Sequence, residues 1–132
     1  MKILHLPSSF GDAVDKMTIL EIKLQRIGDG HKQENVRREL ELVSKALFDS
    51  VKRSPELDAI SGRLKLVNSR LWDVEDAIRR CEAKQEFGDA FIRLARSVYQ
   101  QNDERARLKR EINILVGSVI IEEKSYARYD AE

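Results

Sequence analysis

Residues 57–81 read LDAISGRLKLVNSRLWDVEDAIRRC, and this stretch decides the fold. Its apolar residues recur at alternating steps of three and four, and they are Leu57, Ile60, Leu64, Val67, Leu71, Val74, Ile78 and Cys81. Only a helical period of about 3.5–3.6 residues brings all of these side chains to one face. The pattern therefore predicts one long helix whose narrow apolar seam, of the coiled-coil kind, packs against partner helices.

A second row runs beside the seam, at steps of four, three and four. It consists of Asn68, Trp72, Glu75 and Arg79. A mixed polar row beside a core seam is expected in a bundle with a ligand groove. It is equally expected in an ordinary bundle whose flank is hydrogen-bonded, so the row leaves both alternatives open.

Prolines, glycines and capping residues divide the remainder of the chain. The expected helices span about residues 10–27, 32–52 and 55–86, and a fourth runs from a cap at Asp89 to Val116. Pro55 takes the first helical position, where its missing N–H costs nothing. The predicted fold class is all-α, an antiparallel bundle of about four helices. The first helix, apolar on every side, should be the central one, and the last two should form a hairpin about 40 Å long.

Both ends of the chain read as extended. Lys2–Leu6 and Val119–Ile121 are short β-prone runs that could pair as a terminal β-ribbon. Residues 126–132 are expected to form a flexible tail or an arm that seeks a partner. The whole chain, 1–132, is interpreted as a single helical domain, because this length suits one core.

Composition excludes several functional classes. The chain carries 24 basic and 23 acidic residues, a balance that argues against a dedicated nucleic-acid binder. No apolar run approaches the roughly 18 residues that span a bilayer, and no signal peptide is evident, so we expect a cytoplasmic protein without membrane insertion. No spacing of Cys and His fits zinc, and no glycine-rich phosphate loop occurs, so no metal or cofactor is expected. Cys81 ends the seam and is interpreted as a core residue.

Chemistry could arise where polar residues interrupt the buried faces. Residues 100–107 read QQNDERAR, and they place Gln101 and Arg105 at the centre of the fourth helix's seam. The first helix also carries charges, although a buried charge requires a partner. The candidate ligand-binding residues are Lys23, Arg79, Arg105, Asn102, Glu21, Glu75 and Trp72. In this hypothesis the cations face a small anion, Glu21, Glu75 and Asn102 hold them, and Trp72 anchors the packing.

The alternative is that the same residues pair with one another and fix the register of the helices, which is the commoner outcome. The stretch Arg93–Arg110 contains six basic and two acidic residues. A basic stripe of this length indicates a solvated face or a docking surface for an acidic protein partner rather than a nucleic-acid site.

Ordered phrases along nearly the whole chain carry a family resemblance. They are residues 15–23, 35–40, 71–76, 87–88, 94–96, 102–103, 109–113 and 122–126. Together they resemble the bacterial family called domain of unknown function sixty-one sixty-five. The resemblance implies a loose association with surface-polysaccharide genes, and it implies no activity. A fainter likeness of architecture is to the all-helical chorismate mutases, whose motif spacing this sequence does not reproduce.

The favoured interpretation is a small helical binding or interaction module that forms a homodimer through the long hairpin. The alternative is an enzyme that acts on a small anionic metabolite in a polar groove between helices, with mutase-like or lyase-like chemistry. The sequence leaves open whether the protein is an enzyme.

Overall fold

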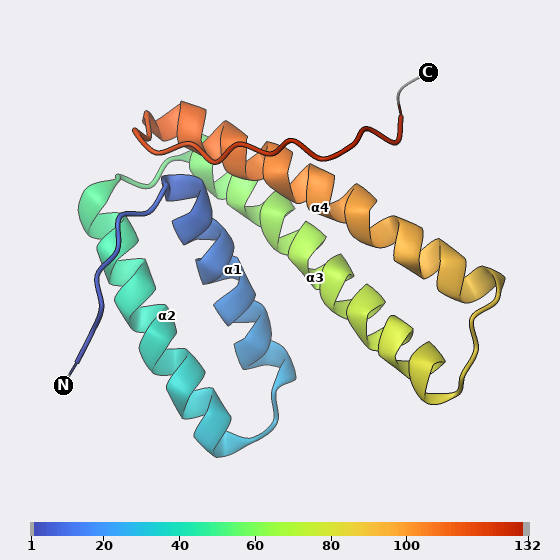
Figure 1. Ribbon diagram of the computed structural model, residues 1–132. Coiled ribbons are helices and arrows are strands. Elements are labelled where there is room, and N and C mark those ends of the chain that lie inside the picture. The colour runs from blue at the N-terminus through green and yellow to red at the C-terminus, as the bar shows by residue number, and fades with distance from the viewer. Residues whose placement is uncertain (1, 131–132) are drawn as a thin grey trace.

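The computed structural model describes residues 2–130, which form the four helices α1 (Phe10–Arg26), α2 (Gly30–Ser50), α3 (Pro55–Ala83) and α4 (Asp89–Val116). The all-α class is confirmed. Figure 1 shows two antiparallel hairpins, α1–α2 and α3–α4, set side by side. Helix α1 is central, as expected, because it packs against each of the other three. Helices α2 and α3, although consecutive, diverge instead of packing together.

Local sequence explains where the helices begin and end. Ser9 and Ser54 cap α1 and α3, since each hydroxyl accepts a hydrogen bond from the backbone N–H three residues later. Asp29 caps α2 in the same manner. The cap predicted at Asp89 is wrong by one position, because Gly88 is the N-cap and has no side chain to donate or accept. Helix α3 ends at Ala83 rather than near residue 86, and a tight turn follows.

The core lies where α1 crosses the α3–α4 hairpin. Its buried side chains are Val14, Leu47, Leu57, Leu64, Val67, Leu108 and Ile112. The seam of α3 is therefore fully buried only at three of its eight positions, all in the first half of the helix. From Leu71 to Cys81 the seam residues are half-buried. The reason is length: α1 has 17 residues and α3 has 29, so α1 ends while α3 continues for about 15 Å.

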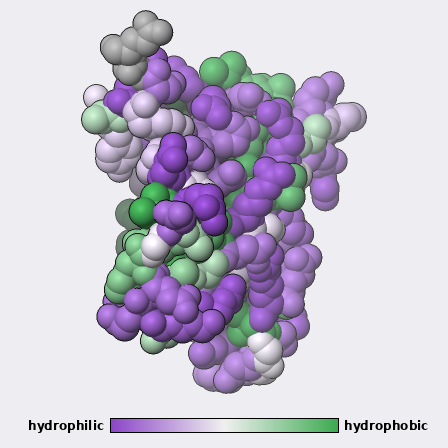
Figure 2. Space-filling view, turned by 90° about the vertical axis from the view of Figure 1, so that its right-hand side faces the viewer, coloured by the Kyte–Doolittle hydropathy of each residue, from purple (hydrophilic) through white to green (hydrophobic). Residues whose placement is uncertain are grey.

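We call residues 74–98 the distal arm, the part of the α3–α4 hairpin that extends beyond the end of α1. The last residue of α1, Arg26, forms an ion pair with Asp73 and marks this boundary. At the tip of the arm the rings of Phe87 and Phe91 meet edge to face at 5.3 Å. Viewed from the side of the α3–α4 turn, the surface is mainly hydrophilic, with hydrophobic residues in narrow strips between charged ones (Figure 2).

The terminal β-ribbon is a wrong expectation, since residues 2–130 contain no strand. The two ends meet at Ser118, whose hydroxyl accepts a hydrogen bond from the N–H of Phe10 at 3.4 Å. From that point they separate. The N-terminal residues lie beside α2, whereas residues 119–130 run back along α4 (Figure 1). No helix within residues 2–130 is long and apolar enough to cross a bilayer.

Candidate functional site

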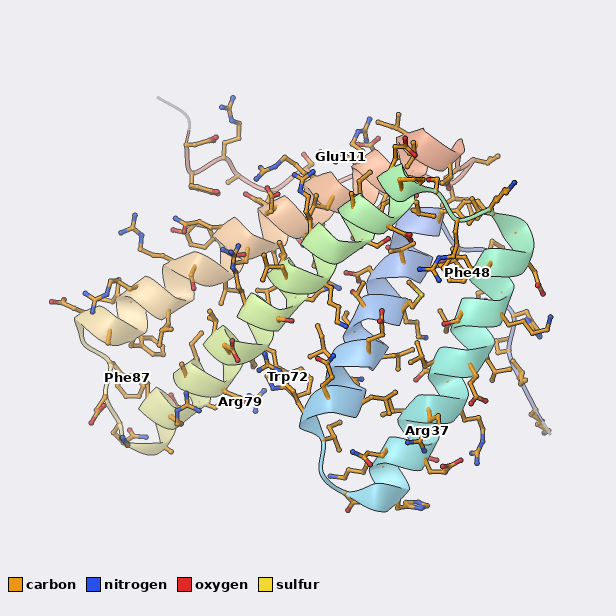
Figure 3. All side chains as sticks on the ribbon, turned by 180° about the vertical axis from the view of Figure 1, so that it is seen from behind. Arg37, Phe48, Trp72, Arg79, Phe87 and Glu111 are labelled. Carbon is orange, nitrogen blue, oxygen red and sulfur yellow. The ribbon has the colours of Figure 1, made fainter. Side chains whose placement is uncertain are left out.

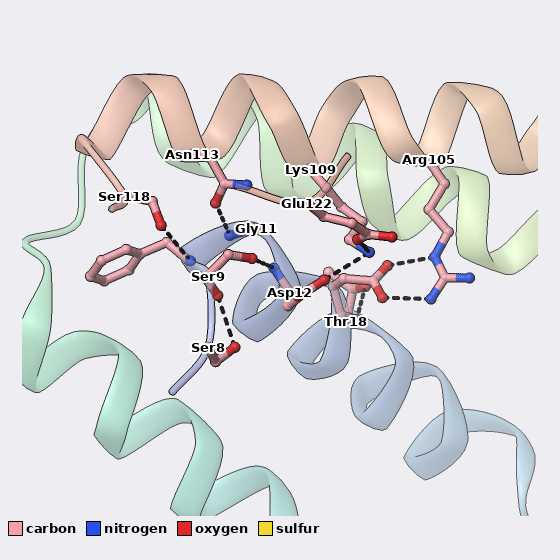
Figure 4. A network of polar contacts seen from close by, with 12 residues as sticks. Ser8, Ser9, Gly11, Asp12, Thr18, Arg105, Lys109, Asn113, Ser118 and Glu122 are labelled. Atoms are coloured by element: carbon pink, nitrogen blue, oxygen red, sulfur yellow. Dashed lines mark hydrogen bonds and ion pairs between the residues drawn. The ribbon is translucent and has the colours of Figure 1, made fainter. Parts of the chain in front are cut away.

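A buried ion pair joins α1 to α4 at the centre of the molecule (Figure 4). The guanidinium of Arg105 donates from Nε and Nη2 to the two carboxylate oxygens of Asp15, at 2.9 and 2.6 Å. The Asp15 side chain is 7% exposed and that of Arg105 is 31% exposed. The hydrogen bonds from Arg105 to Asp15 raise the pKa of the guanidinium above its ordinary value, so Arg105 is a cation in this pair.

Helix α3 completes this network. The side-chain amide of Asn68 donates to Asp15 Oδ1 at 2.9 Å and to Thr18 Oγ1 at 3.0 Å. The hydroxyl of Thr18 in turn donates to the carbonyl of Asp15 at 2.8 Å. Charges and amides from three helices therefore satisfy one another, as a buried polar cluster must if it is to stabilise the fold.

A second polar cluster ties the start of α1 to α4 and to the C-terminal segment. Lys109 Nζ lies 2.8 Å from both Asp12 and Glu122. Partial burial disfavours the ionised form of Asp12, but the hydrogen bond and charge of Lys109 outweigh it, so the pKa of Asp12 is lowered. Nearby, the N–H of Gly11 donates to Asn113 Oδ1 at 2.7 Å. A Cβ at Gly11 would overlap the Lys109 carbonyl, so only glycine allows α1 and α4 to approach this closely.

The residues proposed as a ligand site lie in several separate places. Arg105 contacts Asp15, and not Glu21 or Glu75 as the sequence suggested. Glu21 lies 3.5 Å from Lys65, while Glu75 and Arg79 form an exposed pair one helical turn apart, at 2.9 Å. Lys23 is half-buried elsewhere on α1. Their role as ligand residues therefore stays a prediction, and the register-fixing alternative accounts for the contacts of Arg105.

Trp72 and Arg79 lie on the side of α3 that turns toward the end of α1 (Figure 3), and Glu75 is paired with Arg79. They continue the same stripe that meets α1 at Asn68. On α4, a matching stripe at steps of four, three, four and three contains Phe91, Ala95, Val98, Asn102 and Arg105. The two stripes contact α1 at Asn68 and Arg105. Beyond the end of α1 no further helix of residues 2–130 packs on them, and Arg26 lies over the ring of Trp72 at 5.8 Å. We call the residues 72–79 and 91–102 of these stripes the open face.

A separate cleft of about 630 Å³ lies over α1 between α2 and the start of α3. Its lining includes apolar residues such as Met17, Leu47 and Phe48. Two ion pairs stand at its rim, Glu21 with Lys65 at 3.5 Å and Arg53 with Asp58 at 3.3 Å. Of the seven predicted site residues, only Glu21 lines this cleft. Its size suits a small molecule, and each of its cations is neutralised by a carboxylate.

Sequence reasoning missed some of the residues that hold α1 against α4. Asp15 was recognised as a buried charge without an assigned partner, and the contacts of Gly11, Lys109 and Asn113 were not foreseen. One signal was present: Asp15 and Thr18 are three residues apart, so they share one face of the helix. In residues 2–130, no group of three His, Cys, Asp or Glu side chains is arranged to hold a metal ion.

The comparisons with known proteins bear on family only. No curated protein and no solved structure matches the chain. The family described as "Family of unknown function (DUF6165)" matches residues 4–130, which is nearly the whole sequence. The chain therefore belongs to this family, as the phrases along the sequence suggested.

Proposed function

We propose that the protein is a helical interaction module that forms a homodimer through the open face of the distal arm. One observation carries the proposal: the two stripes that bind α1 continue beyond its end without a covering helix. Stripes spaced for one helix accept another helix with the same geometry. The occupant that we propose is the distal arm of a second copy of the chain.

The chemistry of the open face suits pairing with itself. Trp72, Phe91 and Val98 are half-buried and supply apolar area, and Ala95 is exposed and small enough to allow close approach. In a two-fold interface, residue i contacts residue j while j contacts i. Glu75 and Arg79, already a pair within one helix, can therefore exchange partners between the two copies.

Two matched Ala→Glu variants test this interface in the full chain. Ala95→Glu places a charge at the centre of the open face, whereas Ala59→Glu makes the same change at an exposed position of α3 outside the arm. We expect both variants to keep the wild-type melting temperature, since both alanines are exposed. Sedimentation velocity should then find a monomer for Ala95→Glu and a dimer for Ala59→Glu. A wild-type mass for both variants would reject the open face as the interface.

The cleft beside α2 supports a second candidate function, the binding or turnover of a small anionic metabolite. The supporting observation is that two cations, Arg53 and Lys65, stand at the rim of a cleft of ligand size. A ligand carboxylate or phosphate would have to displace Asp58 or Glu21 from its cation. The test is a thermal melt of the wild type and of Lys65→Ala with a panel of anionic metabolites. A stabilised wild type beside an unresponsive variant would support this function, and an unresponsive wild type would reject it.

The cytoplasmic location and the association with surface-polysaccharide metabolism stay predictions from the sequence and the resemblance. Neither is needed for the dimer or for the cleft.

A further inference from the structure

The C-terminal segment, residues 119–130, follows the outer side of α4 back toward the arm (Figure 1). Glu122 lies 2.8 Å from Lys109, and Glu123 lies 3.0 Å from Arg110. Further along, the rings of Tyr129 and Tyr99 are 4.8 Å apart. Two acid–base pairs and one aromatic pair therefore define how this segment is held.

The surface of α4 beside the segment carries more basic than acidic side chains, and Asp103 is the acid that faces Tyr129. Arg96, Arg107 and Arg110 are all exposed on α4, and Arg107 is paired with Glu104 of the same helix. The two consecutive glutamates of the segment bind at the end of this stripe, where Lys109 and Arg110 adjoin. The seated segment thus shows which chemistry the stripe accepts: consecutive carboxylates followed by an aromatic ring.

The segment is held by charge rather than by burial. Its apolar side chains face solvent, with Val119 98% and Tyr126 80% exposed. The pair between Arg110 and Glu123 is itself well exposed, and exposed ion pairs contribute little to stability. A segment with so few buried contacts opens more readily than the helices around it.

The start of the segment is fixed while the remainder is free to lift. Ser118 is buried, and its hydroxyl bonds the N–H of Phe10 and the carbonyl of Ile120. Gly117, which precedes it, has a left-handed backbone with φ of 71° and ends α4. Lifting the residues after 121 therefore leaves Ser118 and the end of α4 in place, and it removes Glu122 from Lys109, which keeps its ion pair with Asp12 of α1.

We propose that the outer face of α4 is a binding surface for an acidic, tyrosine-bearing extended segment of a partner protein, and that residues 119–130 occupy it as an intramolecular competitor. The partner binds where Glu122, Glu123 and Tyr129 now lie. This surface adjoins the open face on α4, because Tyr99 is one helical turn from Ala95 and from Asn102.

A labelled peptide with the sequence of residues 119–130 serves as the probe, measured by fluorescence anisotropy at low salt. We call the full chain with Glu122→Ala/Glu123→Ala/Tyr129→Ala the strap-released variant, because it lacks the side chains that hold residues 119–130 on α4. If the native segment is bound about nine-tenths of the time, this variant should bind the peptide about tenfold more tightly than the wild type. Adding Arg107→Ala and Arg110→Ala, both at exposed positions, should abolish binding. Adding Lys45→Ala on α2, a matched loss of an exposed cation, should not.

Two results would overturn the proposal. One is equal affinity of the wild type and the strap-released variant for the peptide. The other is equal affinity of the released variant for the peptide and for a version in which both glutamates are alanine. If adding the peptide lowers the mass of the wild-type protein in solution, the segment of one copy binds α4 of another copy. That result would overturn the intramolecular arrangement. Sedimentation velocity of the strap-released variant measures dimer formation separately from its peptide binding, so failure of this proposal can be distinguished from failure of the dimer.

Discussion

Truncation of Arg105 distinguishes a structural network from a ligand site. Arg105→Ala removes both donors to Asp15 and leaves a carboxylate that is 7% exposed without its cation. Breaking a buried pair on one side costs about 3–5 kcal/mol. Arg105 itself is 31% exposed, so water can enter in its place, and Asn68 still donates to Asp15. We therefore expect the low end of the range, about 3 kcal/mol, which lowers the melting temperature of a chain of this size by about 10 °C.

A double-mutant cycle supplies the matched control. Asp15→Asn keeps the shape of the side chain and removes its charge, so the Arg105→Ala/Asp15→Asn double variant has no buried charge left unpaired. Urea unfolding of the wild type, both single variants and the double variant gives the coupling energy. We expect the double variant to lose less than the sum of the single losses, by about 1.5 kcal/mol or more. Additive losses, or a loss below about 1 kcal/mol for Arg105→Ala together with an anion that stabilises only the wild type, would refute the structural assignment.

Three further outcomes are expected. Gly11→Ala should destabilise the fold, because its Cβ meets the Lys109 carbonyl. Gly62→Ala has open space around its Cβ and should stabilise α3 by about 0.5–1 kcal/mol. Equal effects of the two variants in thermal melts would contradict the close approach of α1 to α4. Gln101 Oε1 is buried with no hydrogen-bond partner among residues 2–130, so Gln101→Leu should leave the free energy of unfolding in urea unchanged or raise it by about 1 kcal/mol. A large loss of stability would show that the Gln101 amide does have a hydrogen-bond partner. The pKa of Asp12 is lowered from 3.8, so the stability that its carboxylate contributes is fully present above pH 3.8 and is lost as the pH falls through the lowered pKa. Asp12→Asn should therefore make the free energy of unfolding depend less on pH in acid and leave its slope between pH 5 and 8 unchanged.

The sequence predicts the helices well because their signals are local. The serine caps and Pro55 act within a few residues, and the structure has them where α1 and α3 begin. The seam of residues 57–81 lies in one helix as predicted, but only its first half contains fully buried positions. The choice of α1 as the central helix also follows from its own composition, since a helix that is apolar on every side has to be covered.

What the sequence could not reveal depends on how helices meet in space. Arg105 has several carboxylates at suitable helical positions, and only the crossing of α1 over α4 selects Asp15. Likewise, the seam reads as uniform from Leu57 to Cys81, and only the position where α1 ends makes its second half half-buried. The two stripes that continue past the end of α1, rather than the seam itself, are the feature that supports a dimer.

The most direct test of the dimer is the mass of the wild-type protein in solution. The chain has a mass of 15.3 kDa, so light scattering across a wide concentration range should give twice that value at concentrations where the arms pair. The mass should fall toward that of one chain on dilution or on substitution of Ala95 by Glu. A mass of 15.3 kDa at every concentration would contradict the account.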